Sequence, residues 1–295
     1  MYGQNKFDSS LAEKGSMTKN GGIPVQDQYG MAPLGGSIQT PYGFIGGVNA
    51  SDGGINLADA DPYAESATQL FPLGTTLNWG DRVFKYAFFN GAVTAGLLVQ
   101  QPASIVANHS QMSLTSAVAA TTGDTSDISI ETAGDTDLTL NQYQEGYLIV
   151  NDGTGQGQSW KIKSHPAHDH SADPTCVITV YGKVKTALVG SGTSQVTLTA
   201  NPYKDVIVAP ATETGYIVGA TNIDMSDDYY GWIQTKGPKA MLSGETLVLG
   251  HKIMRSDTDE GAVMPDNGDD LTPQLGSVMA STVVDTEYCL VNLDI

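Results

Sequence analysis

The sequence predicts an all-β protein, with short-stranded β-barrel or sandwich domains that follow an extended, Gly-rich N-terminal arm. Three observations lead to this fold class. Apolar and polar residues alternate in many short runs, as expected for strands that bury one face. The chain has 34 glycines and 13 prolines and few of the Leu- or Ala-rich runs that favour helices. Its first 60 residues are rich in Gly, Asn, Ser and Gln.

The arm, residues 1–60, includes the low-complexity stretch Gly35–Gly47. Such a stretch buries too little apolar surface to offset the conformational entropy that it loses on ordering. If the arm is ordered, we therefore expect neighbouring subunits to hold it, with isolated aromatic side chains such as Tyr29, Tyr42 and Phe44 as anchors in pockets on a neighbour. The alternative is a floppy tail. An arm held by its neighbours would indicate a component of an assembly.

The segment Asp61–Phe71 has the best helix start in the chain. Asp61 can cap the first turn, Pro62 has the backbone angle that a first turn needs, and Pro72 would end the helix. The sequence therefore predicts one short helix directly after the arm.

From Arg82–Phe89 onward the hydrophobic period is two, which indicates strands. The same alternation marks Cys176–Tyr181 and Gln195–Ala200, each with one face to bury and one face to expose. In the final run, Tyr288–Ile295, every second residue is apolar, so we expect the end of the chain to pair within a sheet.

These runs predict an order of domains. A first β segment (61–111) is expected to pack with a C-terminal barrel or sandwich (201–295). Between them lies an inserted β domain (112–200), whose edges carry stretches rich in Thr, Ser and Asp. Short strands at this spacing are typical of small barrels and sandwiches.

The net charge of −18 limits the function. A surface this acidic repels phosphate backbones and anionic lipids, so neither a nucleic acid nor a membrane is expected as a partner. It suits a solvent-facing protein or one that docks on a basic surface. No apolar run is long enough to span a membrane, and no secretory signal is visible at the N-terminus. Cys176 and Cys289 lie in strand-like runs and are expected to be buried free thiols.

For three motifs that resemble binding sites, we prefer a purely structural interpretation. The Gly-rich run Asp152–Gly157 is followed by a strand pattern where a dinucleotide site needs a helix, so it is predicted to be a hairpin turn. The run His165–His170 has metal-ligand residue types, but we expect a solvated loop because no regular element organises it. The acidic stretches Asp257–Gly261 and Asp266–Asp270 lack the EF-hand spacing, and solvated loops are preferred to a calcium site.

No catalytic signature stands out. The sequence has no G-x-S-x-G elbow and no recognisable Cys–His pairing, and we nominate no catalytic, cofactor-binding or metal-binding residue. The aromatic cluster Tyr229–Trp232 is interpreted as core packing, with a sugar-stacking or subunit-contact surface as the alternative. The side chains expected to contact other subunits or a capsid, if any do, are Tyr29, Tyr42, Phe44, Tyr229, Tyr230 and Trp232.

Several segments are similar to a pattern in virion proteins of tailed bacteriophages. They are Gln69–Thr75, Asp81–Ala87, Ala92–Gly96, Tyr229–Pro238 and the hairpin Gly146–Ile162. Together they cover about a third of the chain, in pieces. The chain thus resembles capsid decoration (cement) proteins, although the long arm and the inserted domain depart from the smaller members of that group.

The resemblance implies a β-rich protein on the outer surface of a capsid, made in the host cytoplasm. It implies the major capsid protein and further copies of this chain as partners, with a trimer as one arrangement, and no enzymatic activity. Such proteins commonly bridge capsomers and resist internal DNA pressure. The alternatives are a fibre or receptor-binding protein that recognises host-surface glycans and an enzyme that degrades polysaccharides.

Overall fold

A computed structural model describes residues 60–102, 106–132, 134, 136–173, 175–268, 273–280 and 286–295. Of the arm, it describes the backbone of two short strands, β1 (Ile38–Thr40) and β2 (Gly43–Ile45). Nearly all regular structure in these residues is strand, and the one helical segment among them is the 3-10 turn Ala107–His109. The all-β prediction is confirmed. The prediction of an extended arm concerns residues that otherwise lie outside the described part.

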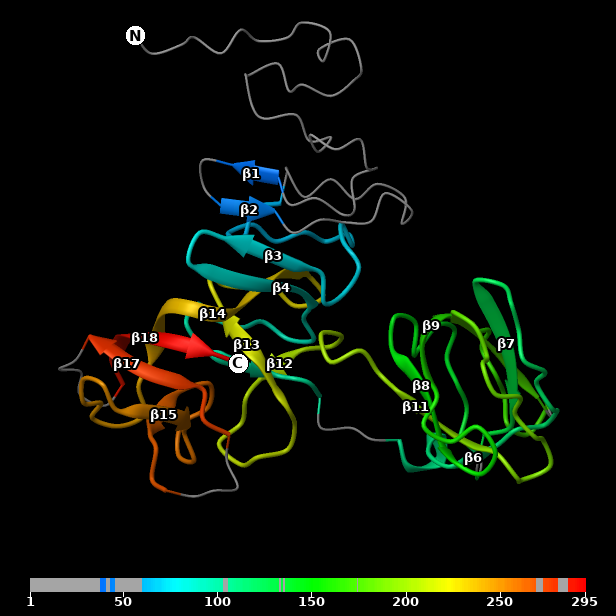
Figure 1. Ribbon diagram of the computed structural model, residues 1–295. Coiled ribbons are helices and arrows are strands. Elements are labelled where there is room, and N and C mark those ends of the chain that lie inside the picture. The colour runs from blue at the N-terminus through cyan, green and yellow to red at the C-terminus, as the bar shows by residue number, and fades with distance from the viewer. Residues whose placement is uncertain are drawn as a thin grey trace, which may run out of the picture.

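The middle of the chain forms a sheet that curls into a barrel (Figure 1). Its described strands are β6 (Met112–Ser113), β7 (Thr125–Ile130), β8 (Tyr147–Asp152), β9 (Ser159–Ser164), β10 (Cys176–Tyr181) and β11 (Gln195–Thr199). They are ordered β6-β11-β8-β9-β10-β7. A β-bridge between Leu114 and Ile130 then brings the two edges of the sheet together. We call residues 112–199 the barrel.

Alternation places one side chain in two inside the barrel. Ile128, Leu148, Ile162 and Ile178 have no exposed surface, whereas their neighbours along each strand point outward. Because side chains of a strand alternate between its two faces, a period of two was sufficient to predict this core. The barrel therefore has its own hydrophobic centre.

The segments before and after the barrel combine into one larger sheet, shown in cyan and in yellow to red in Figure 1. Its described strands are β3 (Thr76–Trp79), β4 (Arg82–Phe88), β5 (Leu98–Gln100), β12 (Ile207–Val208), β13 (Ile217–Thr221), β14 (Tyr230–Leu242), β15 (Lys252–Arg255), β16 (Val263–Pro265), β17 (Gly276–Ala280) and β18 (Tyr288–Asp294). We call it the large sheet. The C-terminal strand β18 pairs with β14 and β17, as the alternation in its sequence predicts.

Strand β14 organises the large sheet because it changes partner along its length. Its first half pairs with β4 and β13, and its second half, from Lys236 to Leu242, pairs with β18. The change occurs at Gly237, whose φ is +90°. A Cβ atom at this position would lie 2.2 Å from the carbonyl oxygen of Asp81. Only glycine combines this backbone angle with such a close approach.

The helix predicted over Asp61–Phe71 is wrong. The carboxylate of Asp61 accepts a hydrogen bond from the backbone N–H of Tyr63 at 2.9 Å and forms a turn. Ser66 then pairs with Tyr230 of β14 through two backbone hydrogen bonds of 2.9 and 2.8 Å. An isolated helix of this length is marginal in water. Pairing with the edge of β14 therefore decides the conformation.

Two smaller predictions are confirmed. Asp152–Gly157 is the turn of the hairpin between β8 and β9, where a Cβ atom on Gly153 would lie 1.6 Å from the carbonyl oxygen of Thr193. Cys176 and Cys289 are buried free thiols, and burial raises the pKa of both. Within the described residues no helix is long and apolar enough to cross a membrane.

Candidate interaction surfaces and the junction between the two sheets

Trp232 lies within an aromatic cluster of the large sheet. Its ring centroid is 5.1 Å from that of Tyr86 and 5.3 Å from that of Phe71, and its exposed fraction is 3%. The contact with Tyr86 is edge-on and the one with Phe71 is tilted, and aromatic contacts at this spacing add to the hydrophobic gain of burial. Core packing, which the sequence favoured for this segment, is confirmed for Trp232. A ring this buried offers no surface to a partner, so Trp232 is removed from the candidate contacts.

The other predicted contact residues are placed differently. Tyr230 is partly buried, with its ring 4.6 Å from that of Phe88, and Tyr229 is also partly exposed. Tyr29 and Tyr42 lie outside the described residues. Phe44 belongs to β2, of which only the backbone is described; β2 lies next to β3 of the large sheet (Figure 1). Of the predicted contact residues whose side chains the structure describes, Tyr229 and Tyr230 therefore keep exposed surface and Trp232 does not.

Tyr230 lines a small polar hollow at the junction between the barrel and the large sheet. The hollow has a volume of ≈ 140 Å³, and Phe88, Glu145 and Lys204 also line it. Burial raises the pKa of the Tyr230 hydroxyl, and the nearby carboxylates of Glu145 and Asp205 raise it further. The hydroxyl therefore stays protonated at neutral pH and can donate a hydrogen bond there.

Glu145 of the barrel contacts the segment that leads into the large sheet. Its carboxylate accepts hydrogen bonds from the side-chain amide of Gln69 at 2.9 Å and from the backbone N–H of Leu73 at 2.5 Å. Its backbone carbonyl accepts a further bond from the side chain of Asn201 at 2.9 Å. Glu145 has a φ of +63°, a strained conformation for a residue with a side chain. Sequence patterns gave no signal for this contact.

An apolar groove opens on the large sheet next to β3. It consists of two hollows of ≈ 240 and ≈ 200 Å³, which share Tyr216 and Ile295. Ile217 and Leu275 line the first hollow, and Thr76 of β3 lines the second. We call these two hollows together the Tyr216 groove. Tyr216 itself is 59% exposed, so its ring is accessible to a partner at the groove.

One nearly buried cation lies at the first hollow of the Tyr216 groove. Arg255 donates a hydrogen bond of 2.8 Å to the carbonyl oxygen of Pro210 and lies 3.8 Å from the carboxylate of Glu213. An arginine held in this way keeps its charge and a fixed orientation. The groove therefore combines apolar walls with a polar end, as ligand and peptide sites commonly do.

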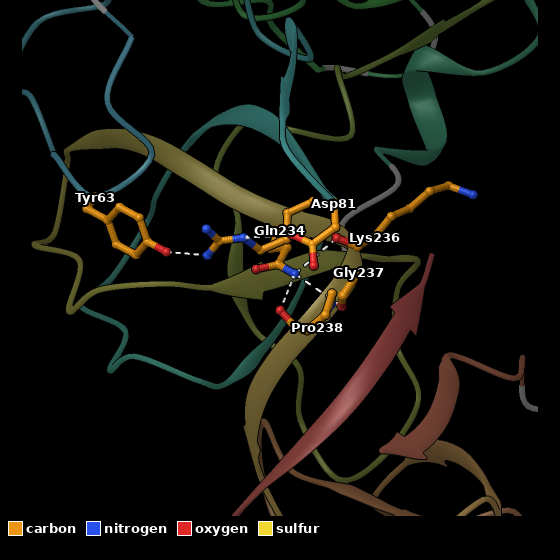
Figure 2. Close-up of polar contacts among 7 residues, drawn as sticks. Tyr63, Asp81, Gln234, Lys236, Gly237 and Pro238 are labelled. Atoms are coloured by element: carbon orange, nitrogen blue, oxygen red, sulfur yellow. Dashed lines mark hydrogen bonds and ion pairs between the residues drawn. The ribbon is translucent and has the colours of Figure 1, made fainter. Parts of the chain in front are cut away.

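Polar contacts stabilise the bend of β14 (Figure 2). The side-chain amide nitrogen of Gln234 donates to the carbonyl oxygens of Lys236, Gly237 and Pro238, at 3.0, 3.2 and 2.9 Å. These bonds tie the side chain of Gln234 to the backbone at the point where β14 changes its partner from β4 to β18. The contacts hold the backbone at the bend, although the side-chain oxygen of Gln234 is buried without a partner among the described residues, and we assign the bend a structural role.

The histidine run is not the solvated loop that the sequence predicted. His165 and His168 are each 3% exposed. The loop folds back on the barrel because His168 forms a two-way backbone bridge with Leu138, at 2.9 and 2.8 Å. Even so, the described residues contain no group of three or more His, Cys, Asp or Glu side chains arranged to hold a metal ion.

The acidic stretches lie at the surface as expected. Asp257, Glu260 and Asp266 are exposed, whereas Asp269 and Asp270 lie outside the described residues. The carboxylate of Asp259 accepts a hydrogen bond of 2.8 Å from the hydroxyl of Thr258. These loops add negative charge to one part of the large sheet.

In comparisons with known proteins, no family model matches the chain, and neither a curated protein nor a solved structure gives a match.

Proposed function

We propose that this chain is a structural virion protein that decorates a phage capsid and stabilises it by binding. Its partners would be the major capsid protein and neighbouring copies of the chain, and its place the outer surface of the capsid. The observation that carries the proposal is the Tyr216 groove, an exposed apolar site on a β scaffold. The residue pattern that resembles decoration proteins supports it independently.

The groove suits one occupant in particular, an aromatic side chain from the arm of a neighbouring copy. Residues 1–59 include Tyr29, Tyr42 and Phe44 on a Gly-rich chain long enough to reach another subunit. The hollows of ≈ 240 and ≈ 200 Å³ have room for one aromatic ring each. An anchor of this kind would bury its ring and order the arm only where a neighbour is present.

The charge of the chain fits this role. With a net charge of −18, free copies repel one another and the packaged DNA, so non-specific association is disfavoured. Specific contacts through an apolar groove must outweigh that repulsion, which salt screens. The same negative charge would favour binding to a basic surface on the capsid shell.

The first test is a particle reconstruction with and without this protein. Hundreds of copies on the outer shell, with residues 1–59 running under neighbouring subunits, would support the decoration role. A few copies at a vertex or on the tail would contradict it and favour adhesion.

A second test addresses the groove in the full-length chain. We expect Tyr216→Ala, and separately the pair Tyr42→Ser with Phe44→Ser, to weaken self-association in sedimentation velocity runs. The matched control is Tyr181→Ala, which removes a ring that is 51% exposed on the barrel. Equal self-association of all three proteins would exclude the groove as the receptor of the arm.

One observation favours the alternative role in glycan recognition. On the outside of the barrel, Lys161 is paired with Tyr147, and the ammonium group of Lys163 lies 5.8 Å from the ring centroid of Tyr181. The two tyrosines are 41% and 51% exposed. Exposed rings can stack on sugars, and lysines can bind acidic ones. Loss of binding to host cells in Tyr181→Ala, but not in Tyr216→Ala, would favour this role.

A further inference from the structure

Three buried imidazoles gather at the end of the barrel that faces the large sheet. His109, His165 and His168 are 1%, 3% and 3% exposed. The Nδ1 atom of His109 lies 2.6 Å from the hydroxyl oxygen of Tyr143, and the backbone N–H of Tyr143 donates to His165. Tyr143 therefore connects two of the three rings. The run His165–His170 was singled out by its residue types, but its pairing with His109 arises only in the fold.

The hydrogen bonds of His165 fix which nitrogen carries the proton. Nε2 accepts the backbone N–H of Tyr143 at 3.0 Å, so it must present a lone pair. Nδ1 lies 2.8 Å from the carbonyl oxygen of Pro166 and must therefore carry the hydrogen. A second proton could bind only at Nε2. It would turn that acceptor into a donor that faces another donor, and the bond to Tyr143 would break.

The rings of His109 and His168 also lack groups that would stabilise an added proton. Within the described residues, neither ring nitrogen of His168 has a hydrogen-bond partner, and neither does Nε2 of His109. The hydroxyl of Tyr143 cannot neutralise a nearby imidazolium, because burial raises its pKa to about 12. A proton on any of these rings would thus be buried without a compensating charge.

Burial and the charged groups around the cluster together lower the pKa of the histidines His165 and His109. Burial lowers the pKa of His165, and the ammonium group of Lys204 lowers it further, while the bond to Pro166 offsets part of the effect. Burial likewise lowers the pKa of His109. The backbone carbonyls of Thr136 and Asp137 oppose this, and the other two imidazoles add to it. The folded protein therefore holds His109 and His165 neutral at neutral pH.

The bond that a proton would break belongs to the loop that joins the two bodies. Asn141 is tied to His165 by two hydrogen bonds, of 2.9 and 3.2 Å, and Lys204 donates to the carbonyl of Gln142 at 2.6 Å. Two residues after Tyr143 comes Glu145, whose carboxylate holds Gln69 and Leu73 of the large sheet. His165 thus supports the segment that carries the junction.

We propose that this histidine cluster is an acid-sensitive release for the junction between the barrel and the large sheet. Protonation of His165 breaks its bond to Tyr143 and frees the loop 141–145. The contacts of Glu145 with the large sheet are then lost, and the barrel can reorient. The sign follows from linkage. The unfolded or opened loop binds protons more tightly, so the closed junction loses stability as pH falls below the ordinary imidazole pKa of about 6.5.

The test is hydrogen exchange of the full-length protein, corrected for intrinsic rates, at about pH 7.5 and about pH 5.5, between which imidazoles titrate and ordinary carboxylates do not. We expect the amides of residues 139–146 and 69–75 to exchange severalfold faster at the lower pH. The strands β8 and β14 should keep their protection. Unchanged exchange in residues 139–146 would overturn the proposal.

Two variants identify the group that titrates. His165→Gln keeps an oxygen that can accept the N–H of Tyr143 but cannot be protonated, so the acid transition should disappear or move to much lower pH. Lys204→Met removes the facing positive charge and should move the midpoint to higher pH, whatever it does to the level of protection. The control is His251→Gln, at an exposed site on the large sheet. An unchanged midpoint in both test variants would overturn the proposal.

Discussion

The barrel and the large sheet differ in the distance along the chain between paired strands. All described barrel strands lie within residues 112–199 and pair with one another. In the large sheet, β4 pairs with β14, which lies on the other side of the whole barrel in the sequence. Pairing over a longer loop costs more entropy and is slower to form. We therefore expect the barrel to form first and the large sheet to close around its two connections.

Their cores differ as well. The barrel is filled mainly by aliphatic side chains and has buried histidines at one end, whereas the large sheet has an aromatic cluster around Tyr86 and Trp232. The large sheet also buries the cationic side chains of Lys239 and Arg255. We therefore expect acid to destabilise the end of the barrel that carries the histidines. Substitutions in the aromatic cluster or in β14 should instead destabilise the large sheet. The following substitutions test this separation.

Truncation of the central ring should have the largest effect. Trp232→Ala removes a side chain that is 3% exposed and is expected to destabilise the large sheet by about 3–5 kcal/mol. Trp160→Ala, at a ring 8% exposed in the barrel, is its counterpart. Denaturant unfolding, followed by hydrogen exchange of β14 and β10, should assign each loss to its own body. Equal loss in both bodies from either variant would show that they unfold as one unit.

A side chain at the bend of β14 should come next. Gly237→Ala puts a Cβ atom 2.2 Å from the carbonyl oxygen of Asp81, at a φ of +90°, and is expected to cost roughly 2–4 kcal/mol. The loss should appear in β4 and β18 and leave the barrel unchanged. Gly157→Ala is a control, because a Cβ atom there meets nothing within 4 Å although φ is also positive. A similar loss in both variants would mean that backbone strain alone, and not the contact with Asp81, is responsible.

The buried lysine should give a pH-dependent effect on the large sheet. Burial, with a contribution from Arg82, lowers the pKa of Lys239 to about 8, whereas an unfolded lysine titrates near about 10.4. The resulting penalty is absent above the unfolded pKa, grows as pH falls towards the folded pKa, and is constant below it. We expect Lys239→Met to stabilise the protein at neutral pH by about 1–3 kcal/mol.

This advantage of Lys239→Met should shrink as pH rises towards about 10, because the wild-type lysine then loses its proton in both states. Urea unfolding of wild type and variant at neutral and high pH measures the difference. An advantage that does not depend on pH would mean that methionine packs better, and not that the charge is costly.

The smallest effect is expected at the junction. Glu145→Gln keeps the shape of the side chain but weakens its bonds to Gln69 and Leu73, at a cost of about 1–2 kcal/mol. The barrel and the large sheet should each keep their own stability and move more freely against one another, which small-angle scattering can detect. Gln144→Ala, at an exposed site in the same loop, is the control. If the barrel itself is destabilised by Glu145→Gln, the strained backbone of Glu145 depends on these bonds.

The alternation of side chains made the strands predictable because it is a local property. In β8, β10 and β18 each buried residue is followed by an outward-facing one, and the sequence shows this directly. The turn at Asp152–Gly157 was predictable for the same reason, since its glycines and the flanking strand patterns lie within a few residues. Such features need no information from distant parts of the chain.

The wrong predictions concern segments whose fate depends on distant partners. Asp61–Phe71 has good local helix signals, but Ser66 finds a strand partner in Tyr230. The histidine run looks like a loop until Leu138 and Tyr143 cover it. For Trp232 the preferred interpretation, core packing, is confirmed, and only the alternative of a contact surface fails, because a strand pattern does not reveal which face of a two-sided sheet is covered.

The sequence by itself determined that this protein is all-β, which residues alternate between core and solvent, and that its surface is acidic, because composition and a period of two depend only on the chain. The tertiary structure alone decided the Tyr216 groove, the Glu145 contacts and the meeting of His109 with His165. Each of these is made by residues far apart in the sequence, which pairing across the large sheet and closure of the barrel bring together.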